Sequence, residues 1–162
     1  MSQDKPAHAD AQRIASAIGT LLLRANRMHL YDTLLEGHTG IDRWTYPVLS
    51  GLARIGPSSA SELADQIGLD RTVTTRYASR LQAAGLLTRQ PSPHDLRATV
   101  LQLTAEGERC IQTLRARLND LVLEALPGWS PSRIHAFAQD FDQVVQNLVG
   151  TPAAGDDEPA ET

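Results

Sequence analysis

Aromatic residues are scarce in this chain of 162 residues, where Phe, Trp and Tyr make up 4 %. A core must therefore be built mainly from Leu, Ile, Val and Ala, which favours packed helices. Cysteine is scarcer still, because Cys110 stands alone and cannot form an internal disulfide, which agrees with a reducing compartment. The length suits one domain of ordinary size.

The sequence also lacks segments that insert proteins into membranes. No apolar run approaches the roughly 20 residues of a membrane span. The N-terminal residues MSQDKPAHADAQ have neither the basic region nor the apolar stretch of a secretory signal. We therefore expect a cytoplasmic protein with no membrane partner.

Motifs of catalysis and cofactor binding are missing as well. The sequence has no Walker loop, Rossmann glycine pattern, H-E-x-x-H or C-x-x-C pair, and its five histidines are scattered. We therefore predict no enzyme activity, no cofactor and no metal. Zinc binding through His94 and Asp95 is a weak alternative, because these residues fall in a segment expected to be an exposed loop.

Positive charge is concentrated in one part of the chain. The net charge is −4, but four acidic residues after position 155 account for it, and the first 150 residues hold 15 basic and 15 acidic side chains. Between Arg71 and Arg97 there are five arginines, with Asp95 as the only acidic residue. Such a cluster is typical of a surface that faces nucleic acid.

Two short helices joined by a tight turn are predicted here, one before the arginine cluster and one at its start. Ser59 and Glu62 have the S-x-x-E spacing of a capping box, which starts a helix that Gly68 can end in the left-handed conformation. Asp70 can cap a second helix immediately. Two short helices with a glycine-containing turn have the build of a helix-turn-helix.

The second of these helices has two different faces. One face is expected to pack against the first helix, and it carries Thr74, Tyr77, Ala78 and Leu81. The other face carries Arg71, Thr72, Val73, Thr75, Arg76 and Arg80. The arginines and hydroxyls indicate a recognition helix for double-stranded DNA.

Two short strands are predicted after Gly85, over residues 86–90 and 98–103. The segment from Pro91 to Asp95 between them has two prolines, each of which removes a donor and fixes φ. It is therefore expected to be neither strand nor helix. A two-stranded hairpin with a projecting tip, called a wing, is the simplest interpretation.

Five fragments of this region occur in a characteristic order. They are Glu62-Leu63-Ala64, Gly68 to Arg71, Arg80 to Leu87, Asp95-Leu96-Arg97 and Leu103 to Gly107. Together, over about 45 residues, they resemble the MarR family of winged helix-turn-helix transcription regulators, although each alone is a weak match. The chain departs from the family at Leu96, where arginine is most frequent, and in the bulky Tyr77.

The resemblance implies a mainly α fold with a small two-stranded β wing and with dimerisation helices at both ends. It implies a sequence-specific DNA-binding regulator, a repressor that binds an inverted-repeat operator as a homodimer and is released by a ligand. In the major groove we expect Arg76 and Thr75 to read bases and Val73 to touch a thymine methyl, while Arg80 is either a contact or a solvated residue.

The wing is expected to hold Arg97 in or beside the minor groove, with Asp95 as its support. An ion pair between Arg97 and Asp95 that only ties the hairpin together is the alternative, and both roles can coexist.

Three amphipathic helices flank this head, from Asp10 to about Leu34, from Ala105 to about Leu126, and after Pro131. Their apolar stripes could close a bundle within one chain or be covered by a second copy, and the resemblance favours the second copy. The residues expected at that interface are Ile14, Ile18, Leu21, Leu114, Leu118, Phe137, Phe141 and Val145.

Another helix is expected over residues 44–55, with Val48, Leu49, Leu52 and Ile55 inward. At its start Arg43, Trp44 and Tyr46 could line a pocket for a planar anion, and the resemblance implies a small aromatic or phenolic effector. Simple packing of Trp44 and Tyr46 is the alternative.

Two other functions remain open at this point. Cys110 could serve a thiol-based redox sensor on the same scaffold, although a small buried hydrophobe is its default role. A winged helix that only docks proteins is the other candidate, but it would not need outward arginines on both helix and wing.

We expect one domain over residues 10–150, with dimerisation helices at 10–36 and 105–149 and the winged head at 44–104. Residues 1–9 and the acidic residues 151–162 are expected to be disordered.

Overall fold

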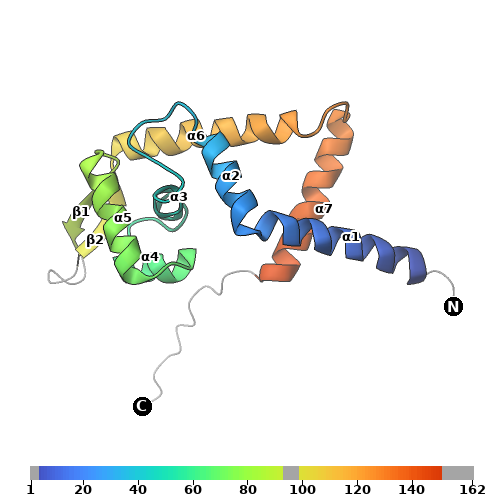
Figure 1. The fold of residues 1–162 in the computed structure, drawn as a ribbon, viewed down its shortest axis with the longest axis horizontal. Coiled ribbons are helices and arrows are strands. Elements are labelled where there is room, and N and C mark those ends of the chain that lie inside the picture. Colours follow the sequence, from blue (N-terminus) through green and yellow to red (C-terminus); the bar gives the residue numbers. More distant parts are fainter. Residues whose placement is uncertain (1–3, 93–98, 151–162) are drawn as a thin grey trace, which may run out of the picture. The chain divides into compact units, whose positions relative to one another are not determined.

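Seven helices and one two-stranded sheet make up residues 4–92 and 99–150, which are the residues described by the computed structural model (Figure 1). The mainly helical fold with a β wing is therefore confirmed. The chain divides after Asn119 into two compact units. In the described part of the chain, no helix has the length and apolar character needed to cross a membrane.

The first helical segment is interrupted. α1 (Asp4–Leu22) and α2 (Arg24–Leu34) replace the single helix predicted up to Leu34. Leu23 lies between them with an extended ψ of 130°, and the side-chain amide of Asn26 donates to the carbonyl of Thr20 at 2.8 Å. The pattern did not predict this break, because three consecutive leucines carry no signal of the kind that Gly or Pro gives.

The start of α1 also differs from the prediction. The helix begins at Asp4, so residues 4–9 are helical where a disordered segment was predicted. Alanines at positions 7, 9 and 11 favour the helix, because alanine has the highest helix propensity of all residues.

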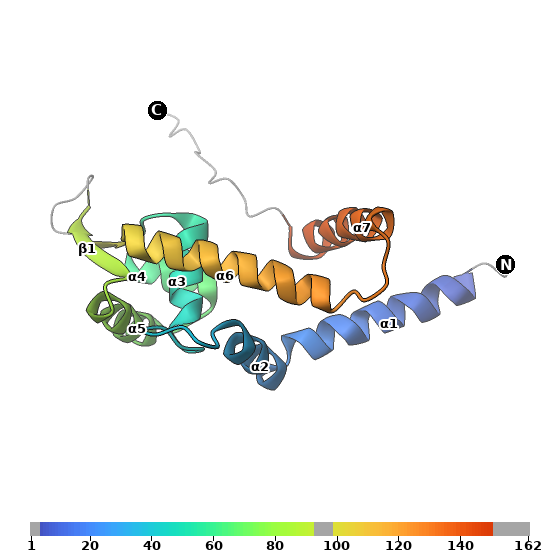
Figure 2. The ribbon, with the colours of Figure 1, turned by 90° about the horizontal axis from the view of Figure 1, so that it is seen from above.

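The core of the head is formed where α3 (Tyr46–Ile55), α4 (Ala60–Ile67) and α5 (Arg71–Ala83) pack together (Figure 2). Its buried side chains include Val48, Leu49, Leu52, Leu63, Ala64, Ala78 and Leu81. Most of the predicted core is confirmed, but Ile55 keeps 38 % of its surface exposed because it is the last residue of α3. α3 starts at Tyr46, later than predicted, because residues 43–45 form a turn whose N–H groups at Trp44 and Thr45 donate to the Asp42 side chain.

Both helix starts of the helix-turn-helix are confirmed. Ser59 Oγ accepts the N–H of Glu62 at 3.2 Å, and the Glu62 carboxylate accepts the N–H of Ser59 at 2.7 Å, which closes the capping box. Asp70 Oδ1 accepts the N–H groups of the second and third residues of α5 at 2.7 and 3.1 Å. The position of the first turn of α5 is therefore fixed by its own sequence.

The wing pairs β1 (Leu87–Pro91) antiparallel with β2 (Thr99–Leu103). Pro91 was predicted to lie outside the strand, and that prediction is wrong because a proline at a strand end removes only a terminal donor. Ser58 exchanges two backbone hydrogen bonds of 2.8 and 3.1 Å with Leu101, a bridge that the sequence did not predict.

α6 (Ala105–Glu124) connects the two units. The hydroxyl of Thr104 accepts the N–H of Gly107 at 3.0 Å and caps the helix as predicted. Leu114 was predicted at a dimer interface, but only 1 % of its surface is exposed in the single chain. It belongs to the core of the head, because the first half of α6 is part of the same unit.

The second unit contains the end of α6 and α7 (Pro131–Val149). Ser130 caps α7 and Pro131 is its first residue, as predicted. Several large apolar side chains of α7 remain exposed, including Phe137, Phe141 and Val145 with between 41 % and 46 % of their surfaces.

Candidate nucleic-acid interface

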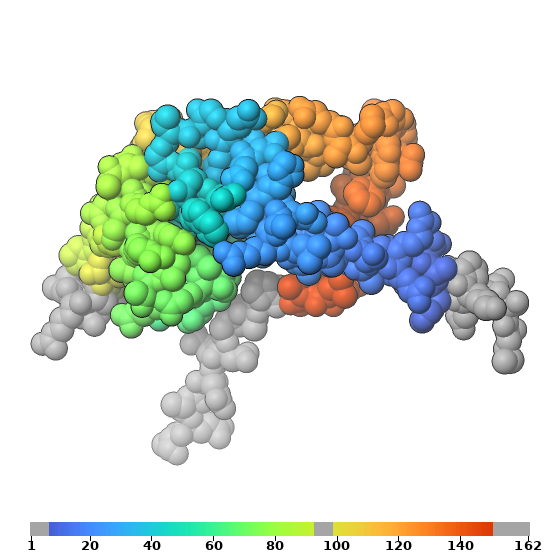
Figure 3. Space-filling model, in the orientation of Figure 1, coloured from blue at the N-terminus to red at the C-terminus, as the bar shows by residue number. Residues whose placement is uncertain are grey.

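α5, the helix expected to read DNA, has the two faces that the sequence predicted. Thr74, Ala78 and Leu81 are completely buried. The residues of the outer face that are exposed are Arg71, Thr72, Thr75, Arg76 and Arg80, and Val73 is half-buried. Figure 3 shows α4, α5 and β1 as one continuous surface in shades of green.

Tyr77 differs from the prediction of a buried residue. Its ring is half-exposed, and the guanidinium of Arg76 lies 5.3 Å from its centre. A large ring is accommodated here because it sits at the edge of the helix-turn-helix core and not inside it.

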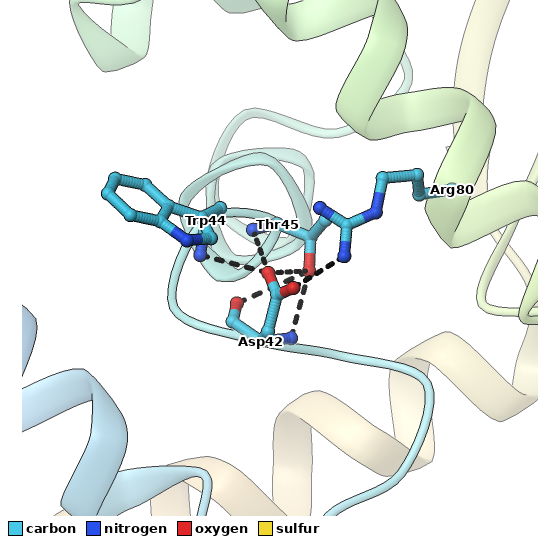
Figure 4. Close-up of polar contacts among 4 residues, drawn as sticks. All are labelled: Asp42, Trp44, Thr45 and Arg80. Carbon is cyan, nitrogen blue, oxygen red and sulfur yellow. Dashed lines mark hydrogen bonds and ion pairs between the residues drawn. The ribbon is translucent and has the colours of Figure 1, made fainter.

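Arg80 forms an ion pair with a residue outside α5. Its Nη2 lies 2.5 Å from Oδ2 of Asp42, a residue in the loop before α3 (Figure 4). The sequence analysis did not single out Asp42, because the two residues are 38 positions apart and no local pattern connects them.

Asp42 is itself held by its loop. Its Oδ1 accepts the backbone N–H groups of Trp44 and Thr45, both at 3.0 Å, and the Thr45 hydroxyl accepts the N–H of Asp42 at 3.0 Å. Burial raises the pKa of Asp42, but hydrogen bonds from Arg80, Thr45 and Trp44 outweigh it and hold the pKa below its usual value. The carboxylate is therefore a fixed anion at neutral pH.

Arg89 of β1 is a second residue that the sequence analysis missed. Its guanidinium donates to Ser79 Oγ at 2.9 Å, to the carbonyl of Thr75 at 3.3 Å, and to the side chain of Gln82. All three acceptors belong to α5, so the wing strand and the recognition helix are joined. A lone arginine in a strand gives no sequence signal for such contacts.

A hollow of about 470 Å³ lies where α4, α5 and the wing meet. It is lined by Ser59, Ala60, Ser61, Arg71, Thr75, Arg89, Thr99 and Leu101. Hydroxyls and arginines dominate this set, which suits an anionic group. The predicted wing residues Asp95 and Arg97 lie outside the described residues.

A larger pocket of about 600 Å³ lies between α2 and the helix-turn-helix. Arg43 and Trp44 line it, whereas Tyr46 packs edge-on against Tyr31 with ring centres 4.9 Å apart. The lining residues that the sequence analysis missed as pocket residues are Arg24, Arg27, Met28, Tyr31, Pro47, Ile67, Gly68, Leu69, Val73 and Tyr77. They come from three separate parts of the chain, so no spacing could group them.

Two positively charged side chains lie close to the Trp44 ring in this pocket. Guanidinium groups of Arg24 and Arg43 lie 5.5 and 5.2 Å from its centre. Arg43 also pairs with Asp32 at 2.8 Å. The pocket thus combines an aromatic wall with cations, which suits a planar anion.

Cys110 and possible metal ligands complete the predicted sites. Cys110 is half-buried, and burial together with the charge of Glu106 raises the pKa of its thiol. Within residues 4–92 and 99–150, no three His, Cys, Asp or Glu side chains gather closely enough to hold a metal ion. His94 and Asp95, the zinc alternative, lie outside the described residues.

A sequence profile described as the MarR family matches residues 39–98, which include the Asp42 loop, α3, α4, α5 and β1. Over these residues the chain is similar to the MarR family, as the sequence indicated. This family consists of transcription regulators that bind DNA, and the outward face of α5 lies within the matched segment.

Two curated relatives from Bacillus subtilis (strain 168) carry the description of HTH-type transcriptional regulator. YxaD is 27 % identical over 114 residues, which are 70 % of this chain and 80 % of YxaD. YdgJ is 28 % identical over 95 residues, which are 59 % of this chain and 58 % of YdgJ. The match to YdgJ thus spans less than two thirds of that protein.

Solved structures share the fold. A MarR family protein from Bacillus stearothermophilus has a TM-score of 0.68 at 24 % identity, with 85 % of this chain and 96 % of that chain covered. RV1404 from Mycobacterium tuberculosis has a TM-score of 0.67 at 22 % identity, with 91 % and 97 % covered.

Proposed function

We propose that this protein binds a specific DNA sequence by placing α5 in the major groove. The observation that carries this proposal is the division of α5 into a fully buried face and an exposed face with arginines and hydroxyls. Arg76 and Thr75 lie in the middle of the exposed face, where base edges come within reach. Val73 can touch a thymine methyl from the edge of that face.

The hollow beside α5 supports a contact to the DNA backbone. Arg71 and the hydroxyls of Ser59, Ser61 and Thr75 line it, and such groups bind phosphate oxygens. A phosphate there would fix the register of α5 without reading sequence. Arg97 from the wing is proposed to add a contact in or near the minor groove.

We further propose a homodimer that binds an inverted repeat. Apolar side chains are exposed on the helices outside the head, including Ile14, Leu21, Phe137, Phe141 and Val145. Burial against a second copy would remove them from water with a gain of about 25 cal/mol per Å². Two-fold symmetry would then place the half-sites about one helical turn apart, roughly 34–36 Å between centres.

The pocket beside Trp44 supports release by a small aromatic or phenolic acid. Val73 and Tyr77 belong to α5 and also line this pocket, so a bound ligand would touch the recognition helix itself. A ligand that fits better when α5 is displaced would lower DNA affinity by its differential binding. The protein would then act as a repressor that its ligand releases.

Selection of bound DNA from a random pool tests the first part of this proposal. Recovery of an inverted repeat with half-sites one turn apart is the expected result. Replacement of Arg76 by Ala should weaken binding to the recovered site by about 1–3 kcal/mol and leave weak binding to random DNA mostly intact. Equal loss on both DNAs would show that Arg76 touches only phosphate.

A further inference from the structure

We propose that Asp42 and Arg80 are positioning residues for DNA recognition and that Arg80 does not itself contact DNA. The inference rests on the proposed function of α5 as the recognition helix. It assigns a role to an acidic residue outside that helix, and it replaces the role that the sequence suggested for Arg80.

The Asp42 carboxylate is held rigidly by its loop. Asp42 Oδ1 accepts hydrogen bonds from the N–H groups of Trp44 and Thr45 and from the Thr45 hydroxyl, at 3.0, 3.0 and 3.2 Å. Thr45 is 99 % covered, with 1 % of its surface exposed, so the loop is anchored in the core of the head. Figure 4 shows that this leaves Oδ2 turned toward Arg80.

The ion pair between Asp42 and Arg80 forms at a small cost in side-chain entropy. Most surface ion pairs contribute little, because two long, mobile side chains must be ordered. Here one partner is already fixed by its loop, and only the Arg80 side chain has to be ordered. The pair can therefore define where the last turns of α5 lie relative to the loop.

Arg80 is a neighbour of Arg76 on the surface of α5. Arg76 and Arg80 are one turn apart and lie on the same strip of the helix surface. A rotation or tilt of α5 that moved Arg80 away from Asp42 would also move Arg76. Base readers must be held within about 0.5 Å of their working positions, and supporting contacts of this kind provide that.

Replacement of Asp42 can test this proposal, because electrostatics and positioning predict opposite changes in DNA affinity. Replacing Asp42 by Asn removes a negative charge near the DNA surface, which by electrostatics alone should strengthen DNA binding. The Asn side-chain oxygen can still accept from Trp44 and Thr45, so the loop keeps its internal bonds. If Asp42 positions α5, the same change should weaken binding to the cognate site.

The experiment is a double-mutant cycle with Asp42→Asn, Arg80→Gln and the double variant, measured on cognate and random DNA over a range of salt. We expect each single variant to weaken cognate binding roughly three- to thirtyfold and the double variant to be no worse than either. The slope of log K against log salt should stay the same in Arg80→Gln, because no phosphate contact is lost. Asp32→Asn, which opens the other ion pair of the loop region, is the matched control and should not weaken cognate binding.

Three results would overturn the inference. They are tighter cognate binding by Asp42→Asn, additive losses in the double variant, and a salt slope smaller by about 0.9 in Arg80→Gln, which would indicate a phosphate contact. If Asp42→Asn does not fold, as judged by helical circular dichroism, the salt slope of Arg80→Gln decides alone. Arg76→Ala separates this inference from the proposed function, because its failure to weaken cognate binding would remove α5 as the reader.

Discussion

Arg89 of β1 donates a hydrogen bond of 2.9 Å to Ser79 of α5, and so joins the wing to the recognition helix. The same guanidinium reaches the Thr75 carbonyl and the Gln82 side chain, which spread its contacts over two turns of the helix. Together with the pair of Asp42 and Arg80, these bonds hold α5 from the wing and from the loop before α3.

Replacement of Arg89 by Met should therefore loosen α5. Hydrogen bonds from a charged donor contribute about 1.5–3 kcal/mol each, and partial exposure of Arg89 lowers this, so we expect a loss of roughly 1–2 kcal/mol in the free energy of unfolding. Urea denaturation measures it, and amide exchange in α5 should become faster. Arg76→Met is the control on the exposed face and should change stability by less than about 0.5 kcal/mol.

Gly107 should tolerate no side chain, although it lies inside a helix. A Cβ built there would be 1.9 Å from the carbonyl oxygen of Leu86, a backbone atom that also accepts the N–H of Thr104. We expect Gly107→Ala to destabilise the head by about 1–3 kcal/mol in spite of the better helix propensity of alanine. Thermal or urea unfolding gives the measurement.

Gly19 provides the matched control for that prediction. It lies within α1, and a Cβ there would have no atom within 4 Å. Gly19→Ala should therefore stabilise by about 0.5–1 kcal/mol, the opposite sign. If both substitutions stabilise the protein, the result would contradict the close contact between Gly107 and the Leu86 carbonyl.

The two glycines illustrate what the sequence could predict. The glycine of the Leu103 to Gly107 fragment was recognisable from resemblance, but a glycine is needed there because Leu86, the residue before β1 and 21 positions away, comes so close. Local features were predicted well, because caps such as Ser59 and Asp70 depend on neighbours within three residues. The faces of α5 followed from helical spacing for the same reason.

Contacts between distant parts of the chain could not be predicted in this way. The roles of Asp42 and Arg89 depend on side chains brought together by the fold, and single charged residues give no pattern. The burial of Leu114 was missed for a related reason. The apolar face that contains Leu114 continues along α6. Helical spacing alone cannot show where along this face the contacts with the head end.

Two buried threonines should respond oppositely to replacement by valine. The hydroxyl of Thr74 in α5 has no hydrogen-bond partner among the described residues, whereas that of Thr45 accepts from and donates to Asp42. Valine has almost the same shape and helix propensity, so Thr74→Val should be neutral or stabilise by up to about 1 kcal/mol. Thr45→Val should cost about 1–3 kcal/mol, because it leaves polar groups of Asp42 unpaired. Equal effects in urea denaturation would contradict this assignment of the hydroxyls.

Oxidation of Cys110 should not control DNA binding. Burial and the nearby carboxylate of Glu106 raise the pKa of the thiol, and the thiolate is the form that reacts with peroxide. The fraction of thiolate at pH 7 is therefore below that of an ordinary cysteine. We expect dilute peroxide to leave cognate binding unchanged in the native chain and in Cys110→Ser alike. Loss of binding in the native chain alone would favour the redox-sensing alternative.

The exposed aromatic residues of α7 should be required for assembly. Phe137 and Phe141 stack with ring centres 5.7 Å apart, yet each keeps more than 40 % of its surface exposed in the single chain. A stacked pair of this kind on an open helix face is a stable platform for a second copy, and its burial would supply much of the apolar area of an interface.

Sedimentation of the native protein at micromolar concentration should accordingly report about twice 17.6 kDa. Phe141→Asp should shift the sedimenting mass to that of a single chain. The free-energy cost of burying an unpaired carboxylate is several times the free energy gained by burying the Phe141 ring. Binding to an inverted repeat should weaken in the same variant, since the two recognition helices would then bind independently. Gln139→Glu, an exposed charge on the same helix, is the control and should sediment like the native protein, as should a chain without residues 151–162. A native protein of single-chain mass that still binds one half-site tightly would contradict both the assembly and the spacing of the operator that it predicts.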